Sequence, residues 1–150
     1  MTKQLRVVFL LTAIGLIATA TAALADNVKI GPVKGATYSG LIKEFDKLTV
    51  KVAANGKSAT VSLPSAPAYC DGGSGPEVQH AHAVKIKAGG LTAKVSYTAA
   101  GSSKPFATVT VKGNFYTFSG EQPVFQGTAK TTFSKSPQCS GQESFQADES

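Results

Sequence analysis

The feature that most constrains the fold is a one-by-one alternation of apolar and polar residues. Leu48, Val50 and Val52 alternate with Thr49 and Lys51. The same period returns along the chain at 60–63, 84–87, 91–97 and 109–115. Successive side chains of a strand point to opposite faces, so each segment has one apolar and one polar face. The pattern is typical of antiparallel strands that are buried on one side only.

Turn residues separate these segments. Asn55-Gly56 predicts a type I′ hairpin, and Ala88-Gly89-Gly90 predicts a second hairpin. We expect loops at 71–76 and 99–105, where turn-forming residues gather. About eight short strands separated in this way predict an all-β antiparallel fold, either a β-sandwich or a barrel-like meander.

One segment is compatible with two structures. Leu41, Phe45 and Leu48 follow Ser39 at helical spacing, which suits a short helix. We expect instead a strand over residues 36–42 that ends in a turn.

The N-terminus has the three parts of a secretory signal peptide. Lys3 and Arg6 give a positive start, an apolar run follows, and Ala23-Leu24-Ala25 supplies the small residues of a cleavage site. We predict that residues 1–25 are a cleaved signal peptide and that 26–150 are a single domain, secreted or periplasmic. A retained membrane anchor is the alternative interpretation of the apolar run.

The charge balance bounds the partners of the predicted domain. It holds thirteen lysines, nine acids and no arginine, a net charge of about +4. A solvated surface dotted with lysine explains this balance, and an anionic polymer or lipid headgroup is the alternative. Nucleic acid is disfavoured, because arginine makes the commonest specific base contacts. The candidate contacts are Lys85, Lys87, Lys94, Lys112 and Lys130.

Cys70 and Cys139 are the only cysteines. An even count without a CxxC motif, in a chain predicted to be exported, indicates one structural disulfide. Closing a loop of this length stabilises a fold by about 4 kcal/mol in the chain-entropy account. Two free, buried thiols are the alternative.

Glycines, cysteines and aromatic residues recur in a recognisable order. They are Tyr38-x-Gly40, Cys70, Val111-x-Gly113-x-Phe115, Gly127-Thr128, Cys139-Ser140-Gly141 and Phe145-x-Ala147. In this order the chain resembles small secreted β-domain proteins of actinobacteria, which pair a middle cysteine with a late one. The resemblance implies a fold and supplies no activity. The chain has Phe145 where tryptophan is usual.

His80 and His82 are the sharpest candidates for chemistry. Residues i and i+2 of a strand share a face, so both imidazoles could reach one metal ion. If the strand is regular, both rings lie at the margin of the core, and Asp71 or Glu77 could add an oxygen ligand. Histidines that are hydrogen-bonded at a strand end, or exposed past a bulge, are the alternative.

Other catalytic patterns are thin. The chain has no Gly-x-Ser-x-Gly elbow. Carboxylates that could form a glycosidase pair fall mostly in expected turns: Glu44, Asp46, Asp71, Glu77, Glu121 and Glu143. The chain has no tryptophan, and Tyr38, Tyr69 and Tyr116 are the residues that could still stack on a sugar.

The sequence thus predicts an exported, non-catalytic binding or structural module, without a cofactor. A small metal-dependent hydrolase using His80 and His82, or a lipocalin-like carrier of an apolar ligand, are the alternatives. The strand pattern also predicts which polar side chains point outward. They are Thr49, Lys51, Thr60, Ser62, Lys85, Lys87, Thr92, Lys94, Thr110, Lys112, Thr128 and Lys130. Such a face would suit an anionic envelope polymer.

Overall fold

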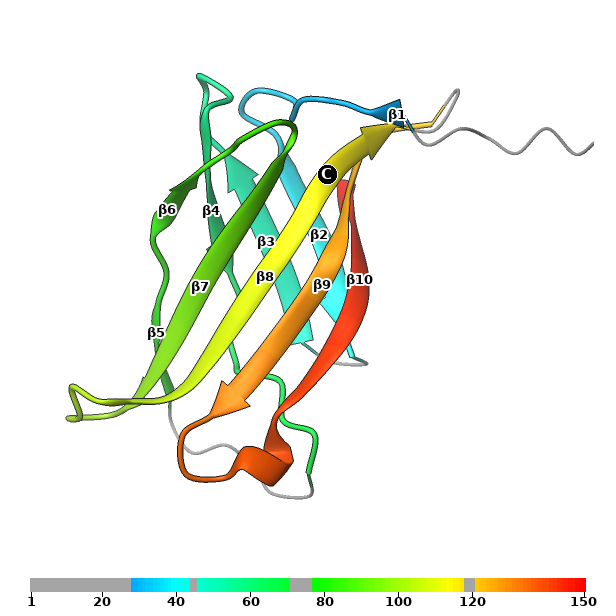
Figure 1. Cartoon of the computed structure of the whole chain (residues 1–150). Coiled ribbons are helices and arrows are strands. Elements are labelled where there is room, and N and C mark those ends of the chain that lie inside the picture. Colours follow the sequence, from blue (N-terminus) through cyan, green and yellow to red (C-terminus); the bar gives the residue numbers. More distant parts are fainter. Residues whose placement is uncertain (1–27, 44–45, 71–76, 118–120) are drawn as a thin grey trace, which may run out of the picture.

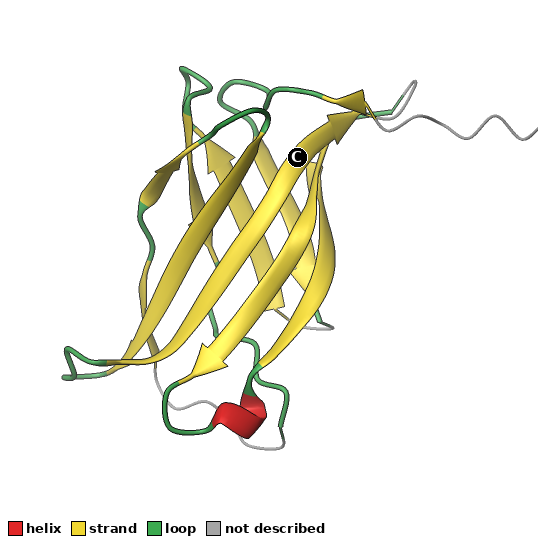
Figure 2. Ribbon diagram, viewed as in Figure 1, coloured by secondary structure: helices red, strands yellow, loops and turns green. Residues whose placement is uncertain are grey.

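A computed structural model of the chain describes residues 28–43, 46–70, 77–117 and 121–150. The predicted signal peptide and two of the candidate carboxylates, Glu44 and Asp71, lie outside these ranges. The described residues are nearly all β (Figures 1 and 2). The elements are β1 (Val28–Lys29), β2 (Thr37–Ile42), β3 (Asp46–Val52), β4 (Ser58–Ser62), β5 (Glu77–His80), β6 (Ala83–Lys85), β7 (Gly90–Ala99), β8 (Pro105–Thr117), β9 (Val124–Phe133), the 3₁₀ turn η1 (Pro137–Cys139) and β10 (Gly141–Glu149).

The strands form one antiparallel sheet that curls back on itself. Its order is β5-β7-β8-β9-β10-β2-β3-β4-β6, and β1 adds to β8. The two ends of this path, β5 and β6, belong to one segment of chain: β5 pairs with β7, and β6 pairs with β4. One segment therefore joins both edges of the sheet, on the left of Figure 1. A barrel-like meander is confirmed, and the sandwich is not, because a sandwich needs two sheets.

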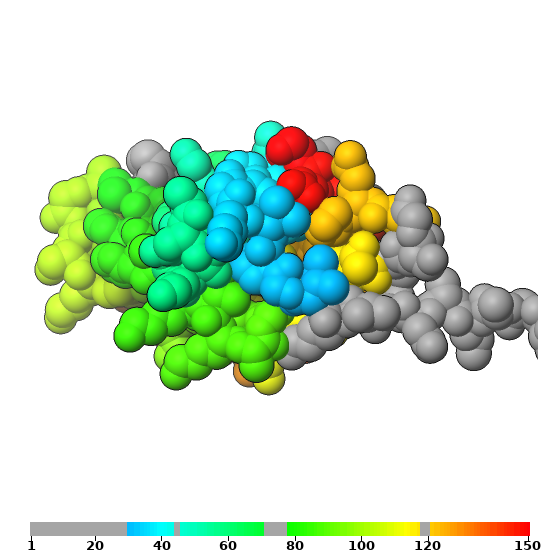
Figure 3. Space-filling view, turned by 90° about the horizontal axis from the view of Figure 1, so that it is seen from above, coloured from blue at the N-terminus to red at the C-terminus, as the bar shows by residue number. Residues whose placement is uncertain are grey.

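The interior is filled with side chains. A chain of aromatic contacts runs through it, with ring centroids 5.1 Å apart for Tyr38 and Phe115, 4.8 Å for Phe115 and Phe125, and 5.5 Å for Phe125 and Phe145. Buried alanines and valines of the other strands complete the same cluster. A barrel of eight strands has an interior just wide enough for side chains to fill. In the view from above, the segment that leads into β2 lies across the end of the barrel (Figure 3).

The predicted alternation is confirmed. In β7, residues from Leu91 to Tyr97 are buried at every second position, and the polar residues between them are not. β2 ends at Ile42 and β3 begins at Asp46, so the strand interpretation of this region is also confirmed.

The two predicted hairpins differ in their outcome. Ala88 and Gly89 both have positive φ, and Lys87 and Gly90 exchange backbone hydrogen bonds of 2.8 and 3.0 Å, as in a type I′ turn. At Asn55-Gly56 the hairpin is present, but the type I′ prediction is wrong. Only Gly56 has positive φ, in a four-residue loop. The Asn55 side chain accepts a hydrogen bond from the Lys57 amide at 2.9 Å, a local bond that suits asparagine at negative φ.

Gln79 closes the barrel through its side chain. Its amide atoms lie 3.2 and 3.3 Å from Ser62 Oγ. In the amide orientation that satisfies both atoms, the nitrogen donates to the Leu63 carbonyl and the oxygen accepts from the Leu63 amide, each at 3.1 Å. These are the two bonds that a paired strand would give to Leu63, the residue that follows β4.

We therefore expect Gln79→Ala to destabilise the fold by about 1–3 kcal/mol, because it leaves the Leu63 amide without a partner. Gln79→Glu should cost a similar amount at neutral pH, since a carboxylate cannot donate to the Leu63 carbonyl. Denaturant unfolding measures both changes. The control is Gln142→Ala on the exposed face of β10, and equal effects at the two positions would contradict the closing role.

Candidate functional site

Of the residues considered for a metal site, His80 and His82 are described, and Asp71 lies outside the described residues. His80 and His82 are both exposed and border one surface hollow, where His80 Nε2 lies 3.1 Å from Thr98 Oγ1. The expectation that they lie at the core margin is wrong, because the strand breaks between Ala81 and Ala83. In the described part of the chain, no group of three histidine, cysteine or carboxylate residues could hold a metal ion.

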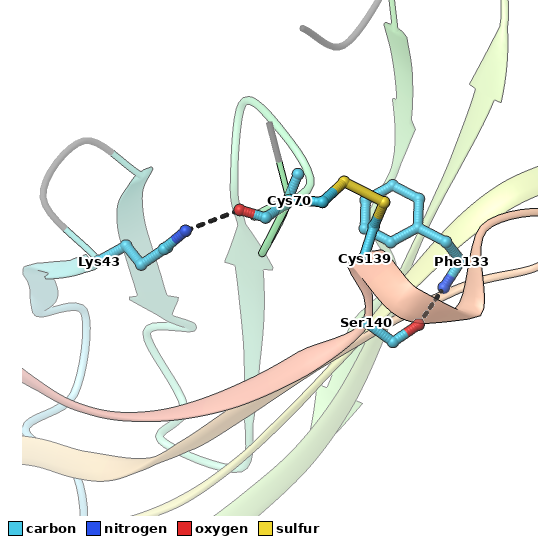
Figure 4. Close-up of a disulfide and its surroundings, with 6 residues drawn as sticks. Lys43, Cys70, Phe133, Cys139 and Ser140 are labelled. Carbon is cyan, nitrogen blue, oxygen red and sulfur yellow. Dashed lines mark hydrogen bonds between the residues drawn. A yellow bond between two sulfur atoms is a disulfide. The ribbon is translucent and has the colours of Figure 1, made fainter. Parts of the chain in front are cut away.

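The disulfide is confirmed, and it seals one end of the barrel. Cys70 and Cys139 are bonded, with their Cα atoms 4.8 Å apart. The bond ties the loop after β4 to the turn η1 (Figure 4). The Tyr69 amide also donates to the Cys139 carbonyl at 3.1 Å.

Lys43 and Tyr69 extend this seal. Lys43 Nζ donates to the Ala68 carbonyl at 2.7 Å and lies 4.7 Å from the centre of the Tyr69 ring (Figure 4 shows the lysine bond). The Lys43 amide donates to Glu143 at 3.1 Å. A Cβ at Gly141 would lie 2.5 Å from the Tyr69 ring, so the ring packs directly on that backbone. Sequence analysis missed this cluster, because its members lie far apart along the chain.

The candidate sugar platforms and carboxylates are mostly committed to the fold. Tyr38 is fully buried, so its prediction as a stacking surface is wrong. Asp46 accepts a hydrogen bond from Ser65 at 2.7 Å, and Glu143 holds the Lys43 amide. The Tyr116 hydroxyl lies 3.4 Å from the Asn114 amide nitrogen.

The prediction that twelve polar side chains of the strands point outward is confirmed. None of the twelve is buried. Strand register arranges six of them as a grid over β7, β8 and β9, which we call the lysine–threonine face. One row is Lys94–Thr110–Lys130, and the next is Thr92–Lys112–Thr128.

Lysine and threonine thus alternate in both directions of this face. Diagonal neighbours on adjacent strands are about 7–8 Å apart, so Lys112 lies at roughly that distance from both Lys94 and Lys130. The face combines three ammonium groups with three hydroxyls between them.

Carboxylates are absent from the stretch that builds most of this surface. Residues 78–120 contain five lysines and no acid. The acids of the described strands lie at strand ends or on β10, as Asp46, Asp148 and Glu149 do. The lysine–threonine face therefore has no anionic side chain among its own residues.

Two of these three lysines are not at a sheet edge. Lys112 and Lys130 are each paired with a residue on both sides. β5 pairs with β7 only at residues 96–99, so Lys94 has a described strand on one side only. Lysine on an open strand edge discourages pairing with another chain, and that reason can account for Lys94 but not for Lys112 or Lys130. The position of these two lysines leaves solubility or a ligand as the reason for their presence.

Comparison of the chain with protein-family models, with curated proteins and with solved structures gives no match. Across the described ranges, no helix has the length and apolar character needed to cross a bilayer.

The buried phenols give the fold a dependence on alkaline pH. Burial raises the pKa of the Tyr69 hydroxyl above its usual value of 10, and the charges of Glu143 and Asp46 raise it further. Burial also raises the pKa of Tyr38. The folded state then keeps protons that the unfolded chain loses above about pH 10. This contribution to stability is complete below pH 10 and is lost as pH rises through the folded-state pKa values.

We expect Tyr69→Phe to flatten the loss of stability above about pH 10, relative to the wild-type chain. Near neutral pH it should cost less than about 1 kcal/mol, since the Tyr69 hydroxyl is buried without a hydrogen-bond partner among the described residues. Tyr97→Phe is the comparison, because the Tyr97 hydroxyl donates to the Leu63 carbonyl at 2.9 Å. Unfolding free energies from about pH 8 to 11 test this, and an unchanged alkaline slope in Tyr69→Phe would count against it.

Proposed function

We propose that this chain is an exported, non-catalytic binding module that holds an anionic polymer of the cell envelope on its lysine–threonine face. The observation that carries the proposal is the grid of Lys94, Lys112 and Lys130, in which Lys112 and Lys130 are paired on both sides and need no protection as edges. Hydroxyls between the ammonium groups add hydrogen-bond donors and acceptors for a hydrated polymer.

The geometry favours many weak contacts over one strong contact. An exposed ion pair contributes about 0–1 kcal/mol. A polymer that repeats its charge can meet several lysines at once, and each added contact raises the effective concentration for the next. Exposed charges are screened by salt, so binding of this kind weakens as ionic strength rises.

The two alternative functions have less support. A metal-dependent hydrolase would need a third ligand beside His80 and His82, and no described residue completes such a set. A lipocalin-like carrier would need an internal cavity, whereas the side chains of Tyr38, Phe115 and Phe125 pack against one another inside the barrel.

Export fits the disulfide. A bond between Cys70 and Cys139 persists where conditions are oxidising. Together with the predicted signal peptide, it supports placement outside the cytoplasm, either secreted or periplasmic.

The first test is retention on isolated cell envelope. We expect Lys94→Gln/Lys130→Gln to weaken retention at low salt by about fivefold or more, as loss of two exposed ion pairs would. Wild-type retention should fade between about 20 and 300 mM salt. The matched control, Lys104→Gln/Lys135→Gln, removes the same charge from exposed positions off the face. Equal losses in both variants, or retention that ignores salt, would contradict the proposal.

The second test is the mass of the protein recovered from outside the cytoplasm. We expect a chain that begins at Asp26, with a mass that rises by two hydrogens on reduction of Cys70–Cys139. Recovery of the uncleaved chain with free thiols would contradict export by this route.

A further inference from the structure

A hollow of about 540 Å³ opens beside the lysine–threonine face. It lies between the hairpin that joins β6 to β7 and the strand β8. Its lining is Val84, Lys85, Lys87, Gly90, Leu91, Thr92, Lys112, Gly113 and Asn114. Three of these nine residues are lysines, and none is acidic.

The hollow exists because β6 leaves β7. Lys87 and Gly90 are paired, but β6 itself pairs with β4, and the Ile86 amide donates to the Lys57 carbonyl at 2.9 Å. The two arms of the hairpin therefore separate beyond the Lys87–Gly90 pair. If the pairing continued, Lys85 would lie opposite Thr92, but Lys85 pairs with Ser58 of β4 instead.

Register places the polar side chains around this opening. Gly90 lies between Lys87 on one side and Asn114 on the other. In the next row, Thr92 and Lys112 are direct partners, and Lys85, which pairs with Ser58 of β4, lines the same hollow. Three ammonium groups, one hydroxyl and one amide thus border the same space.

Two glycines, Gly90 and Gly113, contribute only backbone atoms to the lining of the hollow. A Cβ at Gly90 would lie 2.7 Å from the Gly113 carbonyl oxygen and closer still to the Asn114 side chain. No larger residue fits position 90 without moving one of them, and the absence of a side chain there keeps the space open.

The charge in this space is uncompensated. Among the described residues, Lys85, Lys87 and Lys112 have no carboxylate within ion-pair distance. Like charges held near one another repel, and an anion between them removes that cost.

We propose that this hollow binds a phosphate group carried by the envelope polymer. The inference rests on the proposed function and names its ligand chemistry. A phosphate monoester has a charge of about −1.5 to −2 and three acceptor oxygens, which match three ammonium groups. Lysine binds phosphate as a point charge, and the cations at the hollow are all lysines.

The surroundings favour a polar polymer over a lipid headgroup. The large apolar side chains that are exposed in the described residues are Val33, Leu41 and Val78. None of them borders the hollow, so no exposed large apolar side chain of the described residues lies beside it to enter a bilayer. The hollow is continuous with the lysine–threonine face through Thr92 and Lys112, along which a polymer could extend.

The test is a titration of the full exported protein with methyl phosphate, followed by NMR of backbone amides. We expect saturable shifts centred on Gly90, Thr92 and Asn114. Acetate at the same ionic strength should bind at least about fivefold more weakly, since it has one charge and two oxygens. Lys85→Gln/Lys87→Gln should weaken methyl phosphate binding by about fivefold or more. Lys94→Gln/Lys130→Gln should change it by less than about twofold.

Shifts that spread over every lysine-bearing strand without saturation would overturn the proposal, and so would equal binding of acetate. Vesicles of phosphatidylcholine with phosphatidic acid test the lipid source. If the protein is retained on these vesicles and Lys85→Gln/Lys87→Gln abolishes that retention, the phosphate ligand is a lipid headgroup and not a polymer.

The two proposals fail separately. If Lys94→Gln/Lys130→Gln loses envelope retention while methyl phosphate does not bind, the face is correct and the hollow is not. If methyl phosphate saturates the hollow while envelope retention ignores salt, the hollow is correct and the polymer-binding face is not.

Discussion

The structure depends on one segment that has to satisfy two edges of a sheet. Residues 77–85 pair first with β7 and then with β4, and the change of partner falls at Ala81 and His82. Every unpaired strand edge is a template for another chain, and this segment covers part of both edges. Its two halves cannot pair on both sides at once, so Gln79 bonds to β4 through its side chain. The same divergence opens the hollow beside Gly90.

The interior follows from that closure. A curled sheet of this size encloses a space that side chains have to fill, and large rings from β2, β8, β9 and β10 do so at one level of the barrel. A glycine leaves room for one of these rings, because a Cβ at Gly113 would lie 2.6 Å from the Phe125 ring. The outer face is then free of packing constraints, so its regular lysine and threonine pattern is a property of the surface chemistry and not of the core.

The alternation of residues within each segment predicted the strands well. The features that it did not predict depend on contacts between segments that lie far apart in the sequence. Alternation placed Lys94 and Thr110 outward correctly, because side-chain direction in a strand depends only on neighbours in the chain. Their position side by side depends on register, which a sequence specifies only through loop geometry and burial. His80 was placed wrongly because a change of pairing partner leaves no mark in the alternation of residues 78–86. The contacts of Tyr69 with Lys43 and Gly141 join three distant segments, and no spacing rule connects them.

The bond between Cys70 and Cys139 makes a covalent ring of the chain between them. That ring contains all of β5, β6, β7, β8 and β9, hence the closing segment, the grid of lysines and the hollow together. If the chain is exported as proposed, it meets proteases, and exposed loop tips such as the turn at Gly101 are where proteases cut first. One cut anywhere inside the ring leaves two pieces that are still joined by sulfur. Nicked molecules can therefore keep their surface assembled, and the working lifetime of the domain is set by a second cut or by reduction.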